Sequence, residues 1–255
     1  MNLSLTIDQG NSSAKVSVFS GTTLLQSHRF ERLAPGDLDL VMAGHAVTAA
    51  IYSSVVGNDS QIEELLSAKG VRTYMLDERL PMPLAIDYAT PSTLGHDRIA
   101  AAVGALTLVP GRDCLVVDAG TAVTYDYVTA DAHFKGGNIA PGLSLRFQAL
   151  ASHCVQLPRV DVGGDIPTVG YDTPTAIRSG VVLGLVAEIE MLARRLGSPA
   201  IVLTGGDSPL VAGRISDNVI VDNDLVAKGL NRILEYNEIS VSYTHLRAHE
   251  TRGNL

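Results

Sequence analysis

Two short runs of residues combine an aspartate, a glycine and hydroxyl groups directly after an apolar segment. The first is IDQGNSSAK at residues 7–15, and the second is VDAGTAVT at residues 117–124. A carboxylate can hold a cation or its hydration shell, and glycine lets the backbone come close to a ligand. Hydroxyl and amide groups can hydrogen-bond to a phosphate. Two such turns predict a site that binds the phosphates of a nucleotide.

Each turn taken alone would be an ordinary β-hairpin connection. A third run, IVLTGGD at residues 201–207, predicts a strand that ends in a Gly-Gly turn before a helix. Clefts for phosphate and adenosine in α/β folds are commonly built at such strand ends. The chain contains no Gly-x4-Gly-Lys-[Ser/Thr] run, so we expect a phosphate-binding site of a kind other than the P-loop.

The bulk properties narrow the class of protein. The chain has 255 residues and a net charge of −8, and its length fits one large domain or two of about 110–130 residues. An acidic balance argues against a nucleic-acid partner. No signal peptide precedes the first strand and no apolar run reaches the roughly 18 residues of a membrane span, so we expect no membrane association and a cytoplasmic location. The two cysteines have no metal-ligand spacing, and no disulfide framework is expected.

The hydrophobic pattern predicts an alternation of strands and helices, which is typical of an α/β protein. The region 77–95 is irregular, contains three prolines and is long enough to indicate a functional loop. A second loop is expected at 135–142. Strands are predicted at 3–7, 14–19, 23–30, 49–56, 71–76, 114–117 and 122–128, and helices at 59–69, 96–108, 143–151, 173–196 and 228–236.

The order of the two Asp-x-Gly hairpins and the Gly-Gly turn resembles the superfamily of acetate kinase, sugar kinases and actin. That resemblance implies an α/β fold of two related actin-like, ribonuclease H-like domains with mixed sheets and ATP in the cleft between them. We place the N-terminal domain at residues 1–110 and the C-terminal domain at 111–241. Residues 242–255 have no apolar periodicity and resemble translated cloning or adapter sequence, so we expect a non-native or disordered tail.

A further run, YATPSTLGHDR at residues 88–98, narrows the resemblance. Together with GGNIAPG at 136–142 and DTPTAI at 172–177, it resembles type III pantothenate kinases, and the likeness spans residues 3 to about 237. Two positions depart from the family pattern. Ser12 stands where threonine is usual and keeps the hydroxyl, whereas Thr90 stands where asparagine is usual and removes an amide.

The chemistry of pantothenate agrees with this resemblance, because the molecule carries a carboxylate and a primary hydroxyl. The planar guanidinium of Arg98 can bind a carboxylate in a bidentate manner. Asp97 has the base role in the family, accepting the hydroxyl proton during phosphoryl transfer. The alternatives are that Asp97 only stabilises a helix N-terminus through the helix dipole, and that Arg98 pairs with a neighbouring acid.

The resemblance also implies the ATP site. Asp8 would organise Mg²⁺ through water, and Lys15 would neutralise phosphate charge. Thr121 would bond to a phosphate, and Gly205 and Gly206 would lie by the adenosine. The remaining residues of the first phosphate loop in this implied ATP site are Gly10, Asn11 and Ser12.

The other implied sites concern a cation, the acceptor and a second subunit. Asp118 would hold a monovalent cation, K⁺ or ammonium, and Thr173 would reach pantothenate from the neighbouring subunit of a homodimer. Gly180 and Gly184 suit close helix packing, either at such a subunit interface or within the core. The pantothenate site would be lined by Tyr88, Gly95, His96, Asp97 and Arg98.

The expected activity is the ATP-dependent phosphorylation of pantothenate to 4'-phosphopantothenate, the first step of coenzyme A biosynthesis. Two alternatives stay open from the sequence. One is a kinase of another small carboxylated alcohol or of a sugar. The other is a non-catalytic transcriptional accessory relative, against which the joint presence of Asp97, Lys15 and Asp118 argues.

Overall fold

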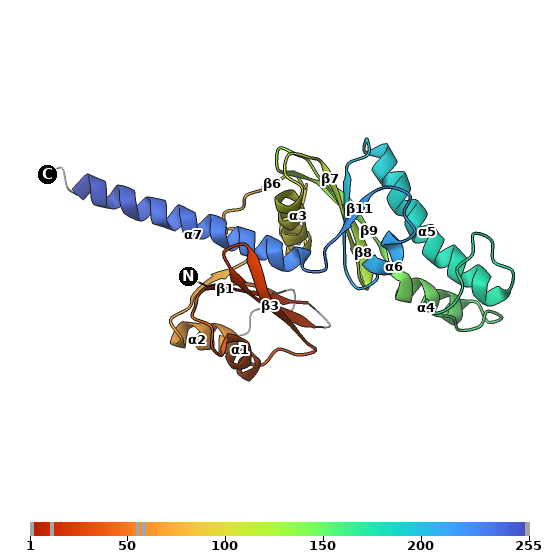
Figure 1. The fold of residues 1–255 in the computed structure, drawn as a ribbon, viewed down its shortest axis with the longest axis horizontal. Coiled ribbons are helices and arrows are strands. Elements are labelled where there is room, and N and C mark those ends of the chain that lie inside the picture. Colours follow the sequence, from red (N-terminus) through yellow and green to blue (C-terminus); the bar gives the residue numbers. More distant parts are fainter. Residues whose placement is uncertain (1–2, 11–12, 55–56, 58–59, 253–255) are drawn as a thin grey trace. The chain divides into compact units, whose positions relative to one another are not determined.

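The computed structural model describes residues 3–10, 13–54, 57 and 60–252, with side chains up to Ile239. The chain forms two compact units (Figure 1). One unit contains the residues up to Leu108 together with those from Leu225 onward, and the other runs from Val109 to Asp224. In the described part, no helix is long and apolar enough to cross a membrane.

The first unit is built on a mixed sheet with strand order β3-β2-β1-β4-β5. Strands β1 to β3 form an antiparallel meander, and β4 and β5 continue the sheet in parallel pairing from β1. The elements of this unit are β1 Leu3–Gln9, β2 Ala14–Ser20, β3 Thr23–Phe30, α1 Pro35–Met42, β4 Val47–Ser54, α2 Ser60–Ala68, β5 Arg72–Met75, β6 Ala85–Ile86, the 3₁₀ helix η1 Pro91–Thr93, α3 His96–Leu108 and α7 Leu225–Arg252.

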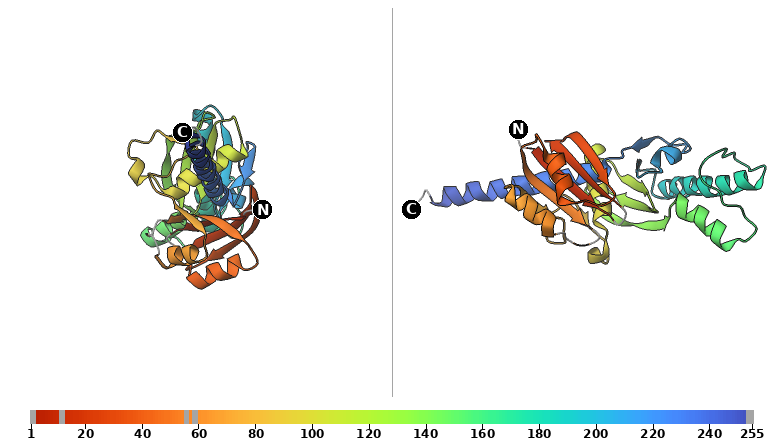
Figure 2. Two further views of the ribbon diagram at one scale, coloured as in Figure 1. Left: turned by 90° about the vertical axis from the view of Figure 1, so that its left-hand side faces the viewer. Right: turned by 90° about the horizontal axis from the view of Figure 1, so that it is seen from below.

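Helices cover both faces of this first sheet. On one face, Leu5 and Ile7 of β1 share a buried cluster with Leu38 of α1 and Ile62 of α2. Side chains alternate along a strand, so Ser4 points to the other face, where its Oγ donates to Oδ1 of Asn231 in α7 at 2.6 Å. Figures 1 and 2 show the sheet between the α1–α2 pair and α7.

Helices α3 and α7 lie side by side in the first unit, and glycines allow their close approach (Figure 1). A Cβ atom at Gly229 would collide with the carbonyl oxygen of Ala100, and one at Gly104 would collide with that of Leu225. The sequence-based boundary assigned residues 225–241 to the second domain, whereas these contacts put α7 in the first unit. The bounds of α7 also include residues 242–252, and the non-native or disordered tail stays a prediction.

The second unit repeats the topology of the first. Its sheet contains the order β11-β10-β7-β8-β9, in which β7 to β9 are antiparallel and β10 and β11 run parallel to β7. If β7 to β11 are matched in chain order to β1 to β5, this order is β5-β4-β1-β2-β3, the same as in the first sheet. Such a repeat is expected for two related domains. The elements are β7 Cys114–Ala119, β8 Ala122–Val128, β9 His133–Pro141, α4 Leu143–His153, α5 Thr173–Arg195, β10 Ala200–Thr204, α6 Ser208–Ala212 and β11 Val219–Val221.

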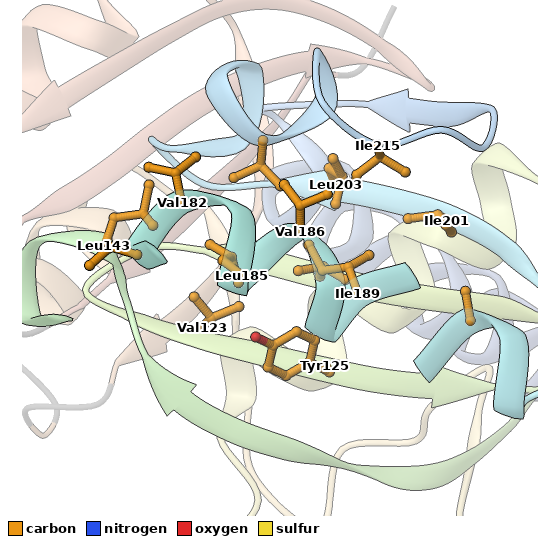
Figure 3. Packing of buried hydrophobic residues seen from close by; sticks show 14 of the residues in the cluster. Val123, Tyr125, Leu143, Val182, Leu185, Val186, Ile189, Ile201, Leu203 and Ile215 are labelled. Atoms are coloured by element: carbon orange, nitrogen blue, oxygen red, sulfur yellow. The ribbon is translucent and has the colours of Figure 1, made fainter. Parts of the chain in front are cut away.

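The core of the second unit lies between its sheet and α5. Figure 3 shows Leu185 and Ile189 of α5 pointing toward Val123 of β8 and Leu203 of β10, and all four are buried. The buried face of α5 therefore packs on the sheet. An added Cβ at Gly180 or Gly184 would meet no atom within 4 Å, so these glycines are not needed for packing within the unit.

Strand β9 and helix α1 differ from the sequence-based expectation, and the short elements β6, η1 and β11 were not predicted. The predicted loop at 135–142 is mostly strand β9, because β8 supplies a paired backbone that overrides the low strand propensity of glycine. Gly136 has φ +118° beside a register shift opposite Tyr127. Helix α1 was missed. It begins at Pro35, and Oδ2 of Asp37 accepts from the backbone N of Ala34 at 2.9 Å.

Candidate active site

The first predicted phosphate turn joins β1 to β2. Asp8 and Lys15 are direct partners across this antiparallel pair, and both are half-buried. The backbone N of Gly10 donates to the carbonyl oxygen of Ser13 at 3.0 Å. The predicted residues Asn11 and Ser12 lie outside the described residues.

The structure of this turn does not itself require glycine at position 10. Gly10 is not in the left-handed region of φ, and an added Cβ would lie 3.4 Å from the oxygen of Ser13, an ordinary van der Waals distance. Close approach of a ligand stays a prediction for Gly10.

Asp8 projects from the sheet face that α7 covers, because it lies four residues after Ser4 on the same strand. Arg29 of β3 is the register partner of Lys15, and its Nε donates to Oγ of Ser13 in the turn at 3.1 Å. Sequence reasoning missed Arg29. The register of the β2–β3 hairpin was the signal that could have found it.

The predicted acceptor residues meet at the N-terminus of α3. Arg98 is buried, with 7% of its surface exposed, and its guanidinium carbon lies 5.9 Å from the centre of the Tyr88 ring. That distance is in the range of a cation–π contact. The side chain of Asp97 turns back so that its Oδ1 accepts from the backbone N of Arg98 at 2.9 Å. His96 is the half-buried first residue of the helix.

The contacts of Asp97 fit both roles left open by the sequence. A carboxylate that accepts a first-turn N–H stabilises the helix N-terminus. It is also the kind of group that could accept a proton from a bound hydroxyl. A Cβ atom at Gly95 would collide with Oδ1 of Asp97, so glycine at this position leaves room for the carboxylate.

Thr90, the departure from the family pattern, has a local role. It caps the short helix η1, and its Oγ1 lies 2.8 Å from Oγ1 of Thr93. Its carbonyl oxygen also accepts from the backbone N of Thr93 at 3.0 Å. Thr90 therefore stabilises the loop that leads into α3.

The second predicted phosphate turn joins β7 to β8 and is closed by neighbouring backbone. The N–H of Gly120 donates to the oxygen of Ala122 at 3.2 Å, and the N–H of Gly142 donates to the oxygen of Thr121 at 3.0 Å. A Cβ atom at Gly142 would collide with the carbonyl oxygen of Gly120. The segment after β9 thus supports the turn that contains Thr121.

Asp118 and Gly205 come together at the ends of the parallel strands β7 and β10. Gly205 has φ +90°, and a Cβ there would collide with Oδ1 of Asp118 and lie 2.6 Å from the carbonyl of Ala119. An added Cβ at Gly206 would meet nothing within 4 Å. Next to them, burial raises the pKa of the Asp207 carboxyl above its usual range.

A polar network that the sequence analysis missed lies between α4 and α5. The guanidinium of Arg146 donates to both carboxylate oxygens of Glu188, at 2.7 and 2.6 Å, and Tyr125 donates to the same carboxylate at 2.6 Å. Nε of Arg146 donates to the carbonyl oxygen of Pro141 at 2.7 Å. These hydrogen bonds, those of Arg146 first, hold the pKa of Glu188 below its usual range. The network therefore connects Glu188 of α5 to Pro141, the residue before Gly142, which contacts the second turn.

Thr173 begins α5 and lines a groove of about 1240 Å³ between α4 and α5. The helix start is fixed by Asp172, whose Oδ1 accepts from the backbone N of Thr175 at 2.8 Å. The groove is lined largely by apolar surface, to which Leu145, Leu150, Ile177 and Val181 contribute.

Metal-ligand chemistry in the described residues is sparse. No three His, Cys, Asp or Glu side chains in this part of the chain form a group that could hold a metal ion. Asp8 and Asp118 each present a carboxylate at the end of a strand. Mg²⁺ is usually held by one or two carboxylates plus substrate phosphates while it keeps several waters, so such sites fit nucleotide-bound Mg²⁺.

Solved structures with low sequence identity share the fold. A protein from Campylobacter jejuni, named as a Baf family transcriptional activator, aligns with a TM-score of 0.61 at 24% identity, over 92% of this chain and 98% of that one. The activator of 2-hydroxyisocaproyl-CoA dehydratase from Clostridium difficile, solved with bound ADPNP, aligns with a TM-score of 0.56 at 10% identity, over 96% and 97%. These likenesses concern the two-domain architecture alone.

Sequence comparison identifies the family. The profile of type III pantothenate kinases matches residues 4–195. The type III pantothenate kinase of Porphyromonas gingivalis is 40% identical over 244 residues, which cover 93% of this chain and 100% of that protein. The one of Bacteroides fragilis is 38% identical over 239 residues, covering 92% and 98%. The chain therefore belongs to the family of type III pantothenate kinases, enzymes that phosphorylate pantothenate in the biosynthesis of coenzyme A.

Proposed function

We propose that this chain transfers the γ-phosphoryl group of ATP to the primary hydroxyl of pantothenate at the N-terminus of α3. The observation that carries this assignment is the buried side chain of Arg98 beside Tyr88, together with the carboxylate of Asp97, which accepts from the backbone N of Arg98. A buried cation with an aromatic neighbour suits the carboxylate of the acceptor. A carboxylate one residue away suits its hydroxyl.

In this mechanism Arg98 binds the pantothenate carboxylate through two parallel N–H donors, and Tyr88 holds the guanidinium plane. Gly95 and His96 line the same site. Asp97 accepts the proton of the primary hydroxyl as the new oxygen–phosphorus bond forms, while the bond between the γ-phosphorus and the ADP oxygen breaks. The hydroxyl proton ends on the Asp97 carboxylate. ADP leaves with the electron pair of the broken bond on its terminal oxygen.

The phosphate groups would be held by the two hairpin turns. Lys15 would neutralise phosphate charge, and Asp8 would hold Mg²⁺ through water. The chemistry that Mg²⁺ would supply there is neutralisation of phosphate charge. The first turn also includes Gly10, with Asn11 and Ser12 assigned from the family resemblance alone.

The second turn would serve the remaining ATP groups. Thr121 donates to a phosphate, Gly205 and Gly206 lie by the adenosine, and Asp118 holds a monovalent cation, K⁺ or ammonium. The support for this is that Gly120 and Gly206 have room for a Cβ within the protein. Glycine at these positions is then explained by a ligand that approaches the backbone.

We further propose a cytoplasmic homodimer in which Thr173 reaches the pantothenate site of the partner subunit. The occupant of the α4–α5 groove would be a second copy of this chain. Support comes from Tyr171, with 70% of its surface exposed, beside this apolar groove. Gly180 also lines the groove and would allow close packing of a helix from the partner.

A coupled ADP-release assay tests the function. We expect ADP release that requires both ATP and pantothenate and that increases with K⁺ or ammonium relative to Na⁺. Asp97→Asn should reduce the rate by about 10²–10⁴-fold while the circular dichroism spectrum stays unchanged. Release that is equally fast with other carboxylated alcohols or sugars would favour the alternative kinase. Equal rates in all three salts would remove the cation role of Asp118.

A further inference from the structure

Ser53 of β4 holds a buried polar atom that the proposed mechanism does not use. Only 1% of its surface is exposed, and its Oγ is the buried side-chain polar atom that has no hydrogen-bond partner within the described structure. Burying a hydroxyl without a partner is unfavourable, and such groups in native proteins usually mark a bound water, ion or functional contact. The hydroxyl therefore needs an explanation outside the protein's own hydrogen bonds.

The register of the sheet puts Ser53 next to Asp8. The two residues are direct partners in the parallel pairing of β1 with β4, and neighbouring strands lie about 4.8 Å apart. Paired residues project to the same sheet face, so Lys15, Asp8 and Ser53 form a row across β2, β1 and β4. The next residue, Ser54, points the other way, and its Oγ donates to the oxygen of Gly57 at 2.6 Å.

We propose that the Ser53 hydroxyl is a positioning residue that accepts a hydrogen bond from a water in the hydration shell of nucleotide-bound Mg²⁺ held at Asp8. Metal-bound waters are strong donors because the ion polarises them, and Mg²⁺ gives up its waters reluctantly. A hydroxyl beside the carboxylate adds a second fixed contact to the same shell. This inference rests on the proposed role of Asp8.

Ser53→Ala tests the inference, with Ser17→Ala as the matched control. Ser17 is also fully buried in the same sheet, but its Oγ lies 2.9 Å from the Oγ of Ser27. The measurements are ADP affinity by titration calorimetry, with Mg²⁺ and with EDTA, and the melting temperature without ligand. For Ser53→Ala we expect ADP affinity to fall about two- to tenfold with Mg²⁺ and to stay unchanged with EDTA, the loss typical of one hydrogen bond.

The melting temperatures separate a ligand-facing hydroxyl from a structural one. Without ligand, Ser53→Ala should melt no lower than the wild type, because no hydrogen bond within the protein is lost. Ser17→Ala should melt lower and keep its dependence on Mg²⁺. A double-mutant cycle with Asp8→Asn should give effects on Mg²⁺-dependent ADP affinity that are not additive.

Three results would overturn the proposal. One is a fall in the ligand-free melting temperature of Ser53→Ala, with its Mg²⁺ dependence intact, which would make the hydroxyl structural. Another is an equal loss of ADP affinity with Mg²⁺ and with EDTA, which would mean a contact to phosphate. The third is a wild type whose ADP affinity does not depend on Mg²⁺, which would also remove the role of Asp8. The ADP-release assay decides the kinase function separately from all three.

Discussion

Gly95 lies so close to Asp97 that a Cβ atom at position 95 would collide with Oδ1 of the Asp97 carboxylate. The atom in the way is the end of a side chain that can rotate. We therefore expect Gly95→Ala to fold normally, to displace the carboxylate and to lower kcat for pantothenate about tenfold or more, as misplaced catalytic groups do. Steady-state kinetics and a melting curve check this. Gly36→Ala is the control, since no atom lies within 4 Å of a Cβ there; equal kinetics for the two variants would contradict the role of Asp97.

Arg98→Lys should raise the KM for pantothenate by at least tenfold and leave the KM for ATP within twofold, because an ammonium cannot reproduce the bidentate contact of a guanidinium. Because Arg98 is buried beside Tyr88, we expect the substitution to affect only the pantothenate site. Arg72→Lys, at an exposed ion pair with Glu238, should change neither value. If the KM for pantothenate is unchanged in Arg98→Lys, another residue binds the carboxylate.

Gly205→Ala and Gly206→Ala form a matched pair at adjacent positions. Gly205 has φ +90° and packs against Asp118 and the backbone of Ala119, so alanine there should lower the free energy of unfolding by about 1–3 kcal/mol. It should also displace Asp118 and reduce activation by K⁺. Gly206→Ala should change stability by less than about 0.5 kcal/mol. Denaturant titration measures both, and equal stability losses would show that the strain at Gly205 is not the cause.

The ion pair between Arg146 and Glu188 should make stability depend on pH on the acid side. The folded protein holds the pKa of Glu188 below its ordinary value, so the contribution is present above the unfolded pKa of about 4.3 and is lost as pH falls through the folded pKa. Because 39% of the Glu188 side chain is exposed, we expect Glu188→Gln to cost only about 1 kcal/mol at pH 7.

The measurement for Glu188→Gln is urea unfolding between pH 7 and pH 3. The difference from the wild type should shrink toward zero at the acid end. Glu235→Gln is the control, because its ion pair with Arg232 is a long one of 3.5 Å between residues three apart on α7. A Glu188→Gln loss that stays constant with pH would mean that packing, and not charge, is responsible.

A shared site predicts complementation between inactive subunits. Mixed dimers of Asp97→Asn and Thr173→Arg chains would each contain one intact site. If half of the dimers are mixed after random exchange, roughly a quarter of wild-type activity should return. The test needs a step that dissociates and reforms the dimers, followed by the ADP-release assay. Confirmed exchange without recovery of activity, or an active wild-type monomer, would contradict the shared site.

Local sequence patterns predicted much of this fold. The strands predicted at 3–7, 14–19 and 23–30 correspond to β1, β2 and β3, and the helix predicted at 173–196 corresponds to α5. Helix α3 has the expected bounds, His96–Leu108. The differences have separate causes. Strand β9 contains glycines of low strand propensity and forms because it pairs with β8 in a hairpin. Helix α7 was assigned to the wrong domain because it packs against α3, a segment far away in the sequence, which local propensity cannot reveal.

The candidate site was predictable in composition and less so in geometry. Motif spacing identified Asp8, Asp97 and Asp118, and the structure adds which neighbours each one has. The proximity of Ser53 to Asp8 depends on a parallel register between strands separated by a hairpin and a helix. Likewise, Gly205 lies against Asp118 because β10 pairs with β7. Such relationships arise from pairing between distant segments and leave no short-range pattern.

The position of α7 has a consequence for the way the chain is made. Leu230, Asn231 and Ile233 of α7 are buried in the first unit, yet the ribosome synthesises them after the whole of the second unit. The face of the first sheet that includes Ser4 therefore stays uncovered until α7 has been made. The segment from Val109 to Asp224 is continuous and contains β7 to β11. Domains usually fold in the order of their synthesis. In this protein we expect the order to be reversed, with the N-terminal sheet completed last.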